Sequence, residues 1–231
     1  MESADQKPAP RPLRCGRWLE SQAWRNGCRR IAGVDEVGRG SLFGPVVAAA
    51  VILNPQVRIR GLNDSKQLEP EERERLAGII RKSALGIAVA AVDAARIDLV
   101  NIREASRIAM RKAVLAIHPP PDFLLVDALE IDVRIAQRLV IHGDCRSASI
   151  AAASIVAKVE RDAWMRQWDR ALPGWGLAEH KGYYTPEHME ALAGRGPSPL
   201  HRRSFAPVAA VSLFPDDETP ENLELFHGHA E

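Results

Sequence analysis

Short apolar runs recur along most of this sequence, separated by turn residues and by longer amphipathic stretches. The runs are of strand length, and several are rich in β-branched residues, which is typical of strands buried in a sheet. Only residues 38–45 separate the first two runs, and so short a connection favours an antiparallel hairpin over a crossover. We therefore predict strands at 31–37, 46–53, 86–92, 122–127 and 138–143.

Apolar residues at helical spacing predict helices in the intervening segments. The segment 70–83 has the clearest signals, because Pro70 suits a first helical turn, acidic residues follow it and basic residues lie near the other end. The segment 147–172 begins with a run of small residues that would let a helix pack closely against a sheet. We predict further helices at 13–30, 97–117 and 187–193.

This mixture of strands and helices predicts one α/β domain over residues 13–210. Residues 1–12 are rich in proline and polar side chains and are expected to form a disordered lead. Residues 211–231 form an acidic tail that we also expect to be disordered. The alternative reading of the tail is a peptide that docks on another protein.

The composition is typical of a globular protein outside the membrane. Hydrophobic residues make up 46% of the chain and charged residues 26%, and no apolar stretch approaches the ~20 residues that span a bilayer. The N-terminus lacks the basic and apolar segments of a secretory signal. Cys15, Cys28 and Cys145 fit neither a disulfide framework nor a zinc site, so we expect a cytoplasmic protein.

The charge is distributed unevenly along the chain. Six of the 30 acidic residues follow Arg203 and none of the 31 basic residues does, so the preceding part carries a net charge of +7. A basic body is compatible with a nucleic-acid partner, although a solvated mixed surface gives the same count.

Acidic residues coincide with the ends of three predicted strands. Asp35 and Glu36 interrupt the first run, while Asp127 and Asp144 follow later ones. Ligands gather at strand ends in open α/β sheets, and four converging carboxylates would need cations among them. Oxygen ligands without a histidine or cysteine cluster favour two Mg²⁺ or Mn²⁺ ions, a device that serves phosphoryl transfer.

Each acid also has a simpler interpretation. A lone aspartate is more often a helix cap or a surface ion pair, and Asp144 in particular could cap the helix that follows it. Asp35 and Glu36 are harder to explain in this way because they lie inside an apolar run. Since successive strand residues point to opposite faces, we expect the strand to fray at Glu36 if both acids face one site.

The glycine-flanked Arg39 follows these acids directly. Gly38 and Gly40 permit positive φ and a close approach of the backbone to a ligand, and arginine suits phosphate.

An ordered set of motifs over residues 30–207 resembles ribonuclease HII. The set comprises Ile31-Ala-Gly-Val-Asp-Glu-Val-Gly-Arg-Gly40, Gly44-Pro-Val-Val, Leu62-Asn-Asp-Ser-Lys66, Val126-Asp127, Gly143-Asp144, Ala152-Ala-Ser-Ile-Val-Ala-Lys158, His180-Lys-Gly-Tyr183 and Arg202-Arg-Ser-Phe205. The resemblance implies an RNase H-like fold, with a central five-stranded mixed sheet flanked by helices and a helical C-terminal region. It also implies metal-dependent cleavage of RNA in RNA/DNA hybrids and incision 5′ of single ribonucleotides in duplex DNA, leaving 3′-hydroxyl and 5′-phosphate ends.

The resemblance also assigns roles to individual residues. It implies that four carboxylates bind two metal ions and carry the catalysis, and that six residues contact the substrate. The backbone of the glycine–arginine segment would sense the 2′-hydroxyl, Tyr183 would pack on the adjoining deoxyribose, and the loop with Ser65 would meet phosphate. The carboxylates are Asp35, Glu36, Asp127 and Asp144, and the substrate-binding residues are Gly38, Arg39, Gly40, Ser65, Lys66 and Tyr183.

Some residues depart from the family pattern, and several interpretations remain open. Ala128-Leu129 stands where Gly-Asn is common, and His142, Cys145 and Tyr184 replace frequent Lys, Ser and Pro. These changes are expected to tune loop shape and rate. Tyr183 could be a rim aromatic and Lys66 a solvated charge.

Two other functions share this fold. One is a nucleic-acid-binding protein that no longer cleaves, and the other is a nuclease of the junction-resolvase kind. The intact acids argue against the first, and the glycine–arginine segment argues against the second. We expect a monomer that acts on RNA/DNA hybrid and ribonucleotide-containing duplex DNA.

Overall fold

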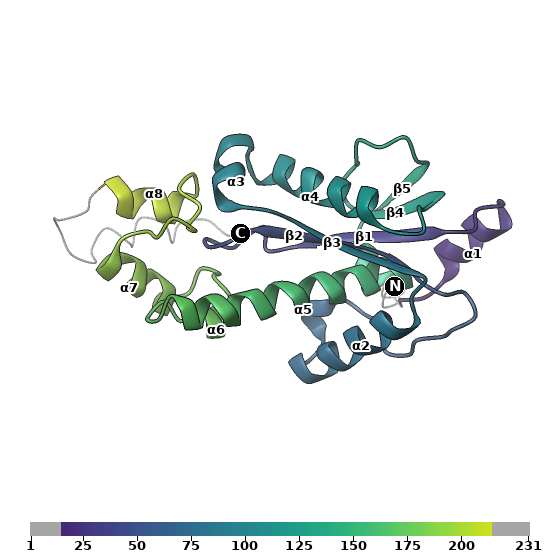
Figure 1. The fold of residues 1–231 in the computed structure, drawn as a ribbon, viewed down its shortest axis with the longest axis horizontal. Helices are drawn as coiled ribbons and strands as arrows, with labels where there is room; N and C mark the ends of the chain where they lie inside the picture. The colour runs from purple at the N-terminus through teal and green to yellow at the C-terminus, as the bar shows by residue number, and fades with distance from the viewer. Residues whose placement is uncertain (1–14, 214–231) are drawn as a thin grey trace, which may run out of the picture.

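The computed structural model describes residues 15–213, which are built around one five-stranded mixed sheet (Figure 1). The sheet has five strands of mixed direction, as the resemblance implies, and the strand order is β3-β2-β1-β4-β5. The strands are β1 (Ile31–Val37), β2 (Val46–Ile52), β3 (Gly86–Val92), β4 (Phe123–Asp127) and β5 (Gln137–Val140).

The pairing of β1 fixes the layout of the sheet. β1 and β2 form the predicted antiparallel hairpin, whereas β4 runs parallel to β1 and β5 runs parallel to β4. The expected fraying at Glu36 is wrong, because Glu36 pairs with Ala48 and Val37 pairs with Val47. The chain turns only at Gly38, whose φ of 87° ends the strand.

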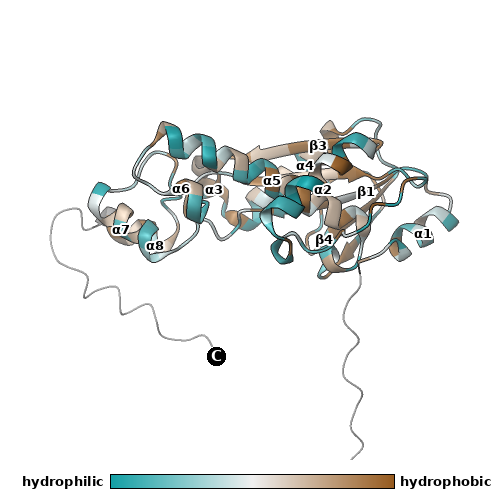
Figure 2. Ribbon diagram, turned by 90° about the horizontal axis from the view of Figure 1, so that it is seen from below, coloured by the Kyte–Doolittle hydropathy of each residue, from teal (hydrophilic) through white to brown (hydrophobic). Residues whose placement is uncertain are grey.

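Helices cover both faces of the sheet. In Figure 1, α3 (Ala94–Val100) and α4 (Ile102–Ala116) lie on one face, while α2 (Pro70–Ser83) and the long α5 (Ala148–Ala171) lie on the other. The strands are mainly brown to white in Figure 2, whereas teal is concentrated on the helices. The sheet is thus the buried middle layer of the domain.

The small residues of α5 allow it to lie close to β1. A Cβ atom at Gly33 would lie 2.0 Å from the backbone carbonyl carbon of Ser149, so only glycine fits at this position. Ala152, Ala153 and Ala157 are fully buried in the layer between α5, α2 and the sheet. This close packing brings the N-terminal half of α5 against the strand that carries Asp35.

The predicted elements are confirmed in outline, with three differences. The helix predicted at 97–117 is broken at Asn101, whose φ of 66° separates α3 from α4 and whose side chain caps α4. The last strand ends at Val140 rather than 143, because His142 is left-handed and the 3₁₀ turn η2 (Gly143–Cys145) follows. Between the helices predicted at 147–172 and 187–193, where no element was predicted, lies the short helix α6 (Leu177–His180).

The C-terminal region is helical, as the resemblance implies. Helices α6, α7 (Pro186–Arg195) and α8 (Ala206–Leu213) lie beyond one end of the sheet (Figure 1) and enclose a separate apolar cluster around Phe43, Met165 and Leu177. The domain boundary expected at 210 falls inside α8.

The ends of the chain complete the description. Helix α1 (Trp18–Arg25) precedes β1, and the 3₁₀ turn η1 (Ser65–Gln67) precedes α2. The lead predicted at 1–12 lies outside the described residues, and so does the tail predicted at 211–231 except for residues 211–213, which belong to α8. Within 15–213, no helix is long and apolar enough to cross a membrane.

Candidate active site

The parallel pairing of β1 and β4 brings two of the predicted acids together. Val34 is the register partner of Val126, so the next residue on each strand is an acid, Asp35 on β1 and Asp127 at the end of β4. The charge of Asp127 raises the pKa of both Asp35 and Glu36, as expected for carboxylates that share one site. The predicted convergence at the strand ends is therefore present for these three acids.

A hydrogen bond ties the fourth acid to the same place. The Gly143 N–H donates to Asp127 Oδ1 at 2.8 Å, which draws the η2 turn and Asp144 toward the end of β4. Asp144 does not cap α5, because Ser147 is the capping residue and accepts from the Ile150 N–H. The Asp144 carboxylate instead accepts from the N–H of the next residue and is left near Asp127.

Asp35 is the most deeply buried of the four acids. It is 5% exposed, and burial, followed by the charges of Glu36 and Asp127, raises its pKa well above the usual value. Hydrogen bonds from the Glu36 N–H at 2.8 Å and from the Ser154 hydroxyl oppose this rise. The negative form is thus only partly compensated by the protein itself.

Glu36 has one carboxylate oxygen with a partner and one without. Its Oε1 lies 3.3 Å from Nη1 of Arg39, whereas its Oε2 is buried and accepts no hydrogen bond from any described residue. Burial raises the pKa of Glu36, the Arg39 charge opposes this rise, and the charge of Asp127 adds to it. A buried oxygen without a donor is unfavourable unless a cation fills the place.

Asp64 is a fifth acid at the site, which the sequence interpretation did not single out. One oxygen of Asp64, one of Asp144 and the Cys145 sulfur lie within 4.8 Å of one another. Burial first, and then the charges of Asp64 and Asp127, raise the pKa of Asp144. The only signal for Asp64 in the sequence was its place in the polar segment 62–66, where it also accepts from the Lys66 N–H.

These residues fit a hard divalent cation. The donors are carboxylate oxygens, as Mg²⁺ and Mn²⁺ prefer, and the unpartnered Glu36 Oε2 and the raised pKa values of Asp35, Glu36 and Asp144 indicate negative charge that the protein does not balance. Burial and Asp144 also raise the pKa of the Cys145 thiol, so this thiol is neutral at pH 7 and is a poor ligand for such ions.

The two glycines beside Arg39 have different surroundings. Gly38 is buried at positive φ, and a Cβ atom there would lie 2.3 Å from Nε of Arg161. Gly40 is exposed, and a Cβ atom there would meet nothing within 4 Å. Gly38 therefore makes room for a buried side chain, and only Gly40 has open space beside its backbone.

Tyr183 lies beside this glycine–arginine segment. Its backbone forms an isolated antiparallel bridge with Ser41. Its ring lies 5.7 Å from Nζ of Lys158 and 5.4 Å from Cζ of Arg161, distances typical of cation–π contacts. The ring remains half-exposed, so the structure brings Tyr183 to the predicted neighbourhood.

The predicted phosphate loop divides into a buried and an exposed residue. Ser65 is 3% exposed and lies at 2.9 Å from the Ser154 hydroxyl, so its side chain is occupied inside the protein. Lys66 is exposed. Burial lowers its pKa, but the charges of Asp64, Asp144 and Asp35 outweigh burial and raise it, which shows that Lys66 lies beside the acids.

Two buried arginines near the site were not predicted as site residues. Arg161 on α5 donates to the carbonyls of Phe43, Pro45 and Lys181 and to the Ser41 hydroxyl. Arg202 donates to the carbonyls of Arg39 and Gly44. Both are fully buried and hold the segment that follows β1. Arg202 was visible only as part of the motif at 202–205.

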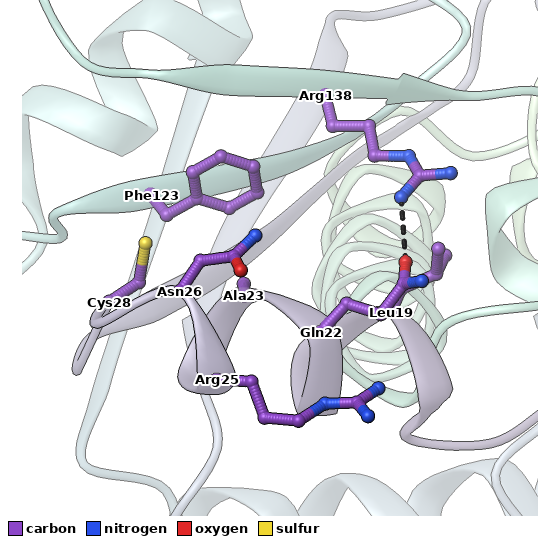
Figure 3. A pocket seen from close by; sticks show the side chains of 8 residues that line it. All are labelled: Leu19, Gln22, Ala23, Arg25, Asn26, Cys28, Phe123 and Arg138. Atoms are coloured by element: carbon purple, nitrogen blue, oxygen red, sulfur yellow. Dashed lines mark hydrogen bonds between the residues drawn. The ribbon is translucent and has the colours of Figure 1, made fainter.

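A shallow pocket lies at the other end of β1, away from the acids (Figure 3). It has a volume of about 450 Å³ and is lined by α1 together with Phe123 of β4 and Arg138 of β5. Arg138 donates to Gln22 across it at 3.0 Å. None of the predicted site residues lines this pocket.

The fold and the acidic site define the class of protein, which is a metal-dependent nuclease with an RNase H-like fold. Residues 32–208 match the model of the family described as Ribonuclease HII. The chain belongs to the ribonuclease HII family.

Similar proteins agree with this assignment. Ribonuclease HII of Solibacter usitatus is 57% identical over 95% of this chain and 96% of its own, and that of Geobacillus kaustophilus is 55% identical over 83% of this chain and 74% of its own. The structure of ribonuclease H2 from Pyrococcus horikoshii is similar with a TM-score of 0.69 and 24% identity, covering 82% of this chain and 100% of that one. The structure of Bst-RNase HIII in complex with Mn²⁺ gives a TM-score of 0.65 at 26% identity, over 92% and 75% of the two chains.

Proposed function

We propose that this chain hydrolyses the RNA strand of RNA/DNA hybrids and incises duplex DNA on the 5′ side of single embedded ribonucleotides. The products would carry 3′-hydroxyl and 5′-phosphate ends. The observation that carries the proposal is the group of acids at the ends of β1 and β4, with the unpartnered Oε2 of Glu36 among them and an exposed glycine backbone beside them.

Asp35, Glu36, Asp127 and Asp144 would hold two divalent ions, Mg²⁺ or Mn²⁺. When bound, such ions supply a water of lowered pKa and neutralise charge on the leaving oxygen. The family membership and the Mn²⁺ complex of the structurally similar RNase HIII support this ligand class. The role of the protein in this proposal is to hold four carboxylates in a buried setting where few of its own donors compete with a cation.

Charged and aromatic residues around the acids would bind and orient the substrate. Lys66 stays charged because Asp64, Asp144 and Asp35 raise its pKa, and its exposed ammonium suits a backbone phosphate. The half-exposed ring of Tyr183 suits the apolar face of a deoxyribose. We propose that the role expected of Ser65 at phosphate passes to its backbone, since its hydroxyl is engaged with Ser154.

The choice of RNA over DNA would rest on the backbone near Arg39. The 2′-hydroxyl distinguishes the two sugars, and a backbone N–H can reach it only where no side chain intervenes. Gly40 meets this requirement and Gly38 does not. The ion pair with Glu36 would keep the Arg39 side chain at the edge of the site.

The test compares four labelled nucleic acids of matched sequence with Mg²⁺ or Mn²⁺ present. They are an all-DNA duplex, the same duplex with one ribonucleotide, an RNA/DNA hybrid and a branched DNA. We expect cleavage of the second and third, with a cut 5′ of the ribonucleotide and a product that DNA polymerase extends from its 3′-hydroxyl. Binding without cleavage would identify a non-catalytic protein, and cleavage of the branched DNA alone would identify a junction nuclease.

A further inference from the structure

Arg202 is anchored by its backbone to the segment that follows β1. The Arg202 N–H donates to the Leu42 carbonyl at 2.9 Å, and the Gly44 N–H donates to the Leu200 carbonyl at 2.8 Å. The segment around Phe43 thus pairs with the segment around His201. The position of the Arg202 side chain is therefore fixed from its own backbone outward.

The guanidinium of Arg202 holds two carbonyls of the facing segment. Its Nε donates to the Gly44 carbonyl at 2.9 Å, and its Nη1 donates to the Arg39 carbonyl at 2.8 Å. Its Nη2 is buried without a hydrogen-bond partner in the described part of the chain, and no carboxylate there forms an ion pair with the group. Burial, followed by the charge of Arg161, lowers the pKa of Arg202 to about 9, so the group stays charged at pH 7.

The bond to the Arg39 carbonyl fixes the direction of the next N–H. The peptide between Arg39 and Gly40 is trans, since the only cis bond in the described residues precedes Pro119. In a planar trans peptide the N–H points away from the carbonyl. The carbonyl is directed at the buried Arg202, so the Gly40 N–H is directed away from it.

Nothing in the described protein uses this N–H. Gly40 is exposed, no described residue accepts a hydrogen bond from it, and a side chain at this position would meet open space. A charged donor on the carbonyl side of a peptide also polarises the peptide and strengthens its N–H as a donor. The geometry thus presents the Gly40 N–H as an activated donor beside the acids.

We propose that Arg202 is a positioning residue for sugar recognition, which orients and polarises the Arg39–Gly40 peptide so that the Gly40 N–H donates to the 2′-hydroxyl oxygen of the ribonucleotide. This inference rests on the proposed function. It differs from the role of Arg161, which holds the carbonyls of Phe43 and Pro45 but not that of Arg39.

The test compares Arg202→Lys with Arg203→Lys, the same change at an exposed neighbour. Lysine keeps the charge but cannot span both carbonyls in the manner of a guanidinium. For each protein, KM and kcat are measured on duplex DNA with one ribonucleotide, and Ki is measured for the all-DNA duplex as a competitor. We expect Arg202→Lys to raise KM about tenfold, the effect of one charge-assisted hydrogen bond, with Ki changed less than about twofold.

A loss of correctly folded protein would lower kcat without raising KM. Comparing the change in KM with the change in kcat therefore distinguishes a positioning role of Arg202 from an effect on protein stability. An unchanged KM in Arg202→Lys, or an equal rise in KM and Ki, would overturn the inference. Arg203→Lys is expected to leave the ratio of Ki to KM unchanged. An equal fall in that ratio for Arg202→Lys and Arg203→Lys would also contradict the inference about Arg202. A wild-type protein that leaves the ribonucleotide intact would contradict the proposed function instead.

A second variant removes the donor and leaves Arg202 in place. Glycolic acid incorporated at position 40 converts the amide N–H into an ester oxygen without adding a side chain. We expect the same rise in KM for the ribonucleotide duplex, with Ki for the all-DNA duplex unchanged. An ester variant with the KM of the wild type would exclude the Gly40 N–H as the sugar-reading donor.

Discussion

Two regions lie beside the end of β1, one that buries negative charges and one that buries positive charges. The protein balances the charges of the two regions differently. The acids Asp35 and Glu36 have few protein donors near their carboxylates, and burial raises the pKa of each. The arginines Arg161 and Arg202 are buried equally well, but backbone carbonyls accept hydrogen bonds from both. Burial lowers the pKa of both guanidinium groups, and that of Arg202, about 9, leaves this group charged at pH 7.

The difference shows which charge is permanent structure and which is kept for a ligand. Carbonyl oxygens are partial charges supplied by the fold itself, so they balance Arg161, and Arg202 apart from its unpartnered Nη2, whether or not anything binds. The acids accept single backbone hydrogen bonds, which leave most of their charge unbalanced, and Oε2 of Glu36 has no partner among the described residues. The arginine region therefore holds the backbone around the site in place. The acidic region carries negative charge that bound cations would balance.

The largest expected effect comes from removing one acid. Asp127→Asn should lower the cleavage rate by at least ~100-fold, more than the loss of an outer-shell partner of a metal typically costs. The asparagine oxygen can still accept from the Gly143 N–H, so the fold should persist. The measurement is kcat/KM on duplex DNA with one ribonucleotide, together with the unfolding midpoint.

Asp122→Asn is the matched control at the opposite end of β4. Asp122 accepts from the N–H groups of Arg29 and Arg30 and lies away from the site. The cleavage rate of Asp122→Asn should stay within about twofold of the wild-type rate. Equal rates for Asp127→Asn and wild type would show that the acidic region is structural as well, and would remove the contrast between the two regions.

The next largest effect concerns the arginine region and is on stability. Arg161→Met keeps the length of the side chain but leaves several buried oxygens without a donor, so we expect a loss of about 3 kcal/mol or more in the free energy of unfolding. Urea unfolding without metal measures it. Arg166→Met on the same helix removes an exposed ion pair with Glu74 and should change stability by less than about 1 kcal/mol. Similar losses for both variants would contradict a structural role for Arg161.

A third effect follows from the pKa shifts of the acids and is on thermal stability. The folded protein raises the pKa values of Asp35, Glu36 and Asp144, so without metal their contribution to stability is greatest below about pH 4 and falls as the pH rises through the raised values. Divalent ions bind the deprotonated acids. Mn²⁺ should therefore raise the unfolding temperature more at pH 8 than at pH 5. At ~100 times its Kd, the bound ion should add about 2.7 kcal/mol to the free energy of unfolding.

Differential scanning fluorimetry at the two pH values, with and without Mn²⁺, measures this effect. Asp35→Asn is the control, because it removes the most buried of these charges and should reduce both the metal effect and its pH dependence. A metal-induced shift of equal size at pH 5 and pH 8 would contradict the proposed use of these acids.

Local patterns in the sequence predicted most elements but not the contacts that join them. The bounds of β1, β3 and α2 agree with the prediction because apolar runs and helix-end charges are local signals. The break at Asn101 was missed because the apolar spacing continues across it, while asparagine tolerates the left-handed conformation that separates the two helices.

The acids and the arginines also differ in how far the sequence revealed them. Acids inside an apolar run are conspicuous, and Asp127 and Asp144 were found from their places at the ends of later predicted strands. Arg161 and Arg202 were not singled out, because most of their acceptors are carbonyls from residues 39–45, more than a hundred positions earlier. The fraying expected at Glu36 failed for a related reason, since pairing with β2 holds the strand to Val37.

The smallest effect sharpens the description of the acidic region through its backbone. Ala128 follows Asp127 directly, is exposed and has a φ of 50°, a conformation that costs an alanine about 1–2 kcal/mol. Glycine relieves this cost but gains freedom in the unfolded chain, so Ala128→Gly should stabilise the protein by about 0.5–1 kcal/mol. Ala84→Gly, at a φ of −69°, has no strain to relieve and should destabilise it. Urea unfolding of both variants measures the difference. Equal destabilisation of the two variants would mean that the turn after Asp127 is unstrained. Alanine at position 128 would then cost the protein no more free energy than the glycine that is common in the family.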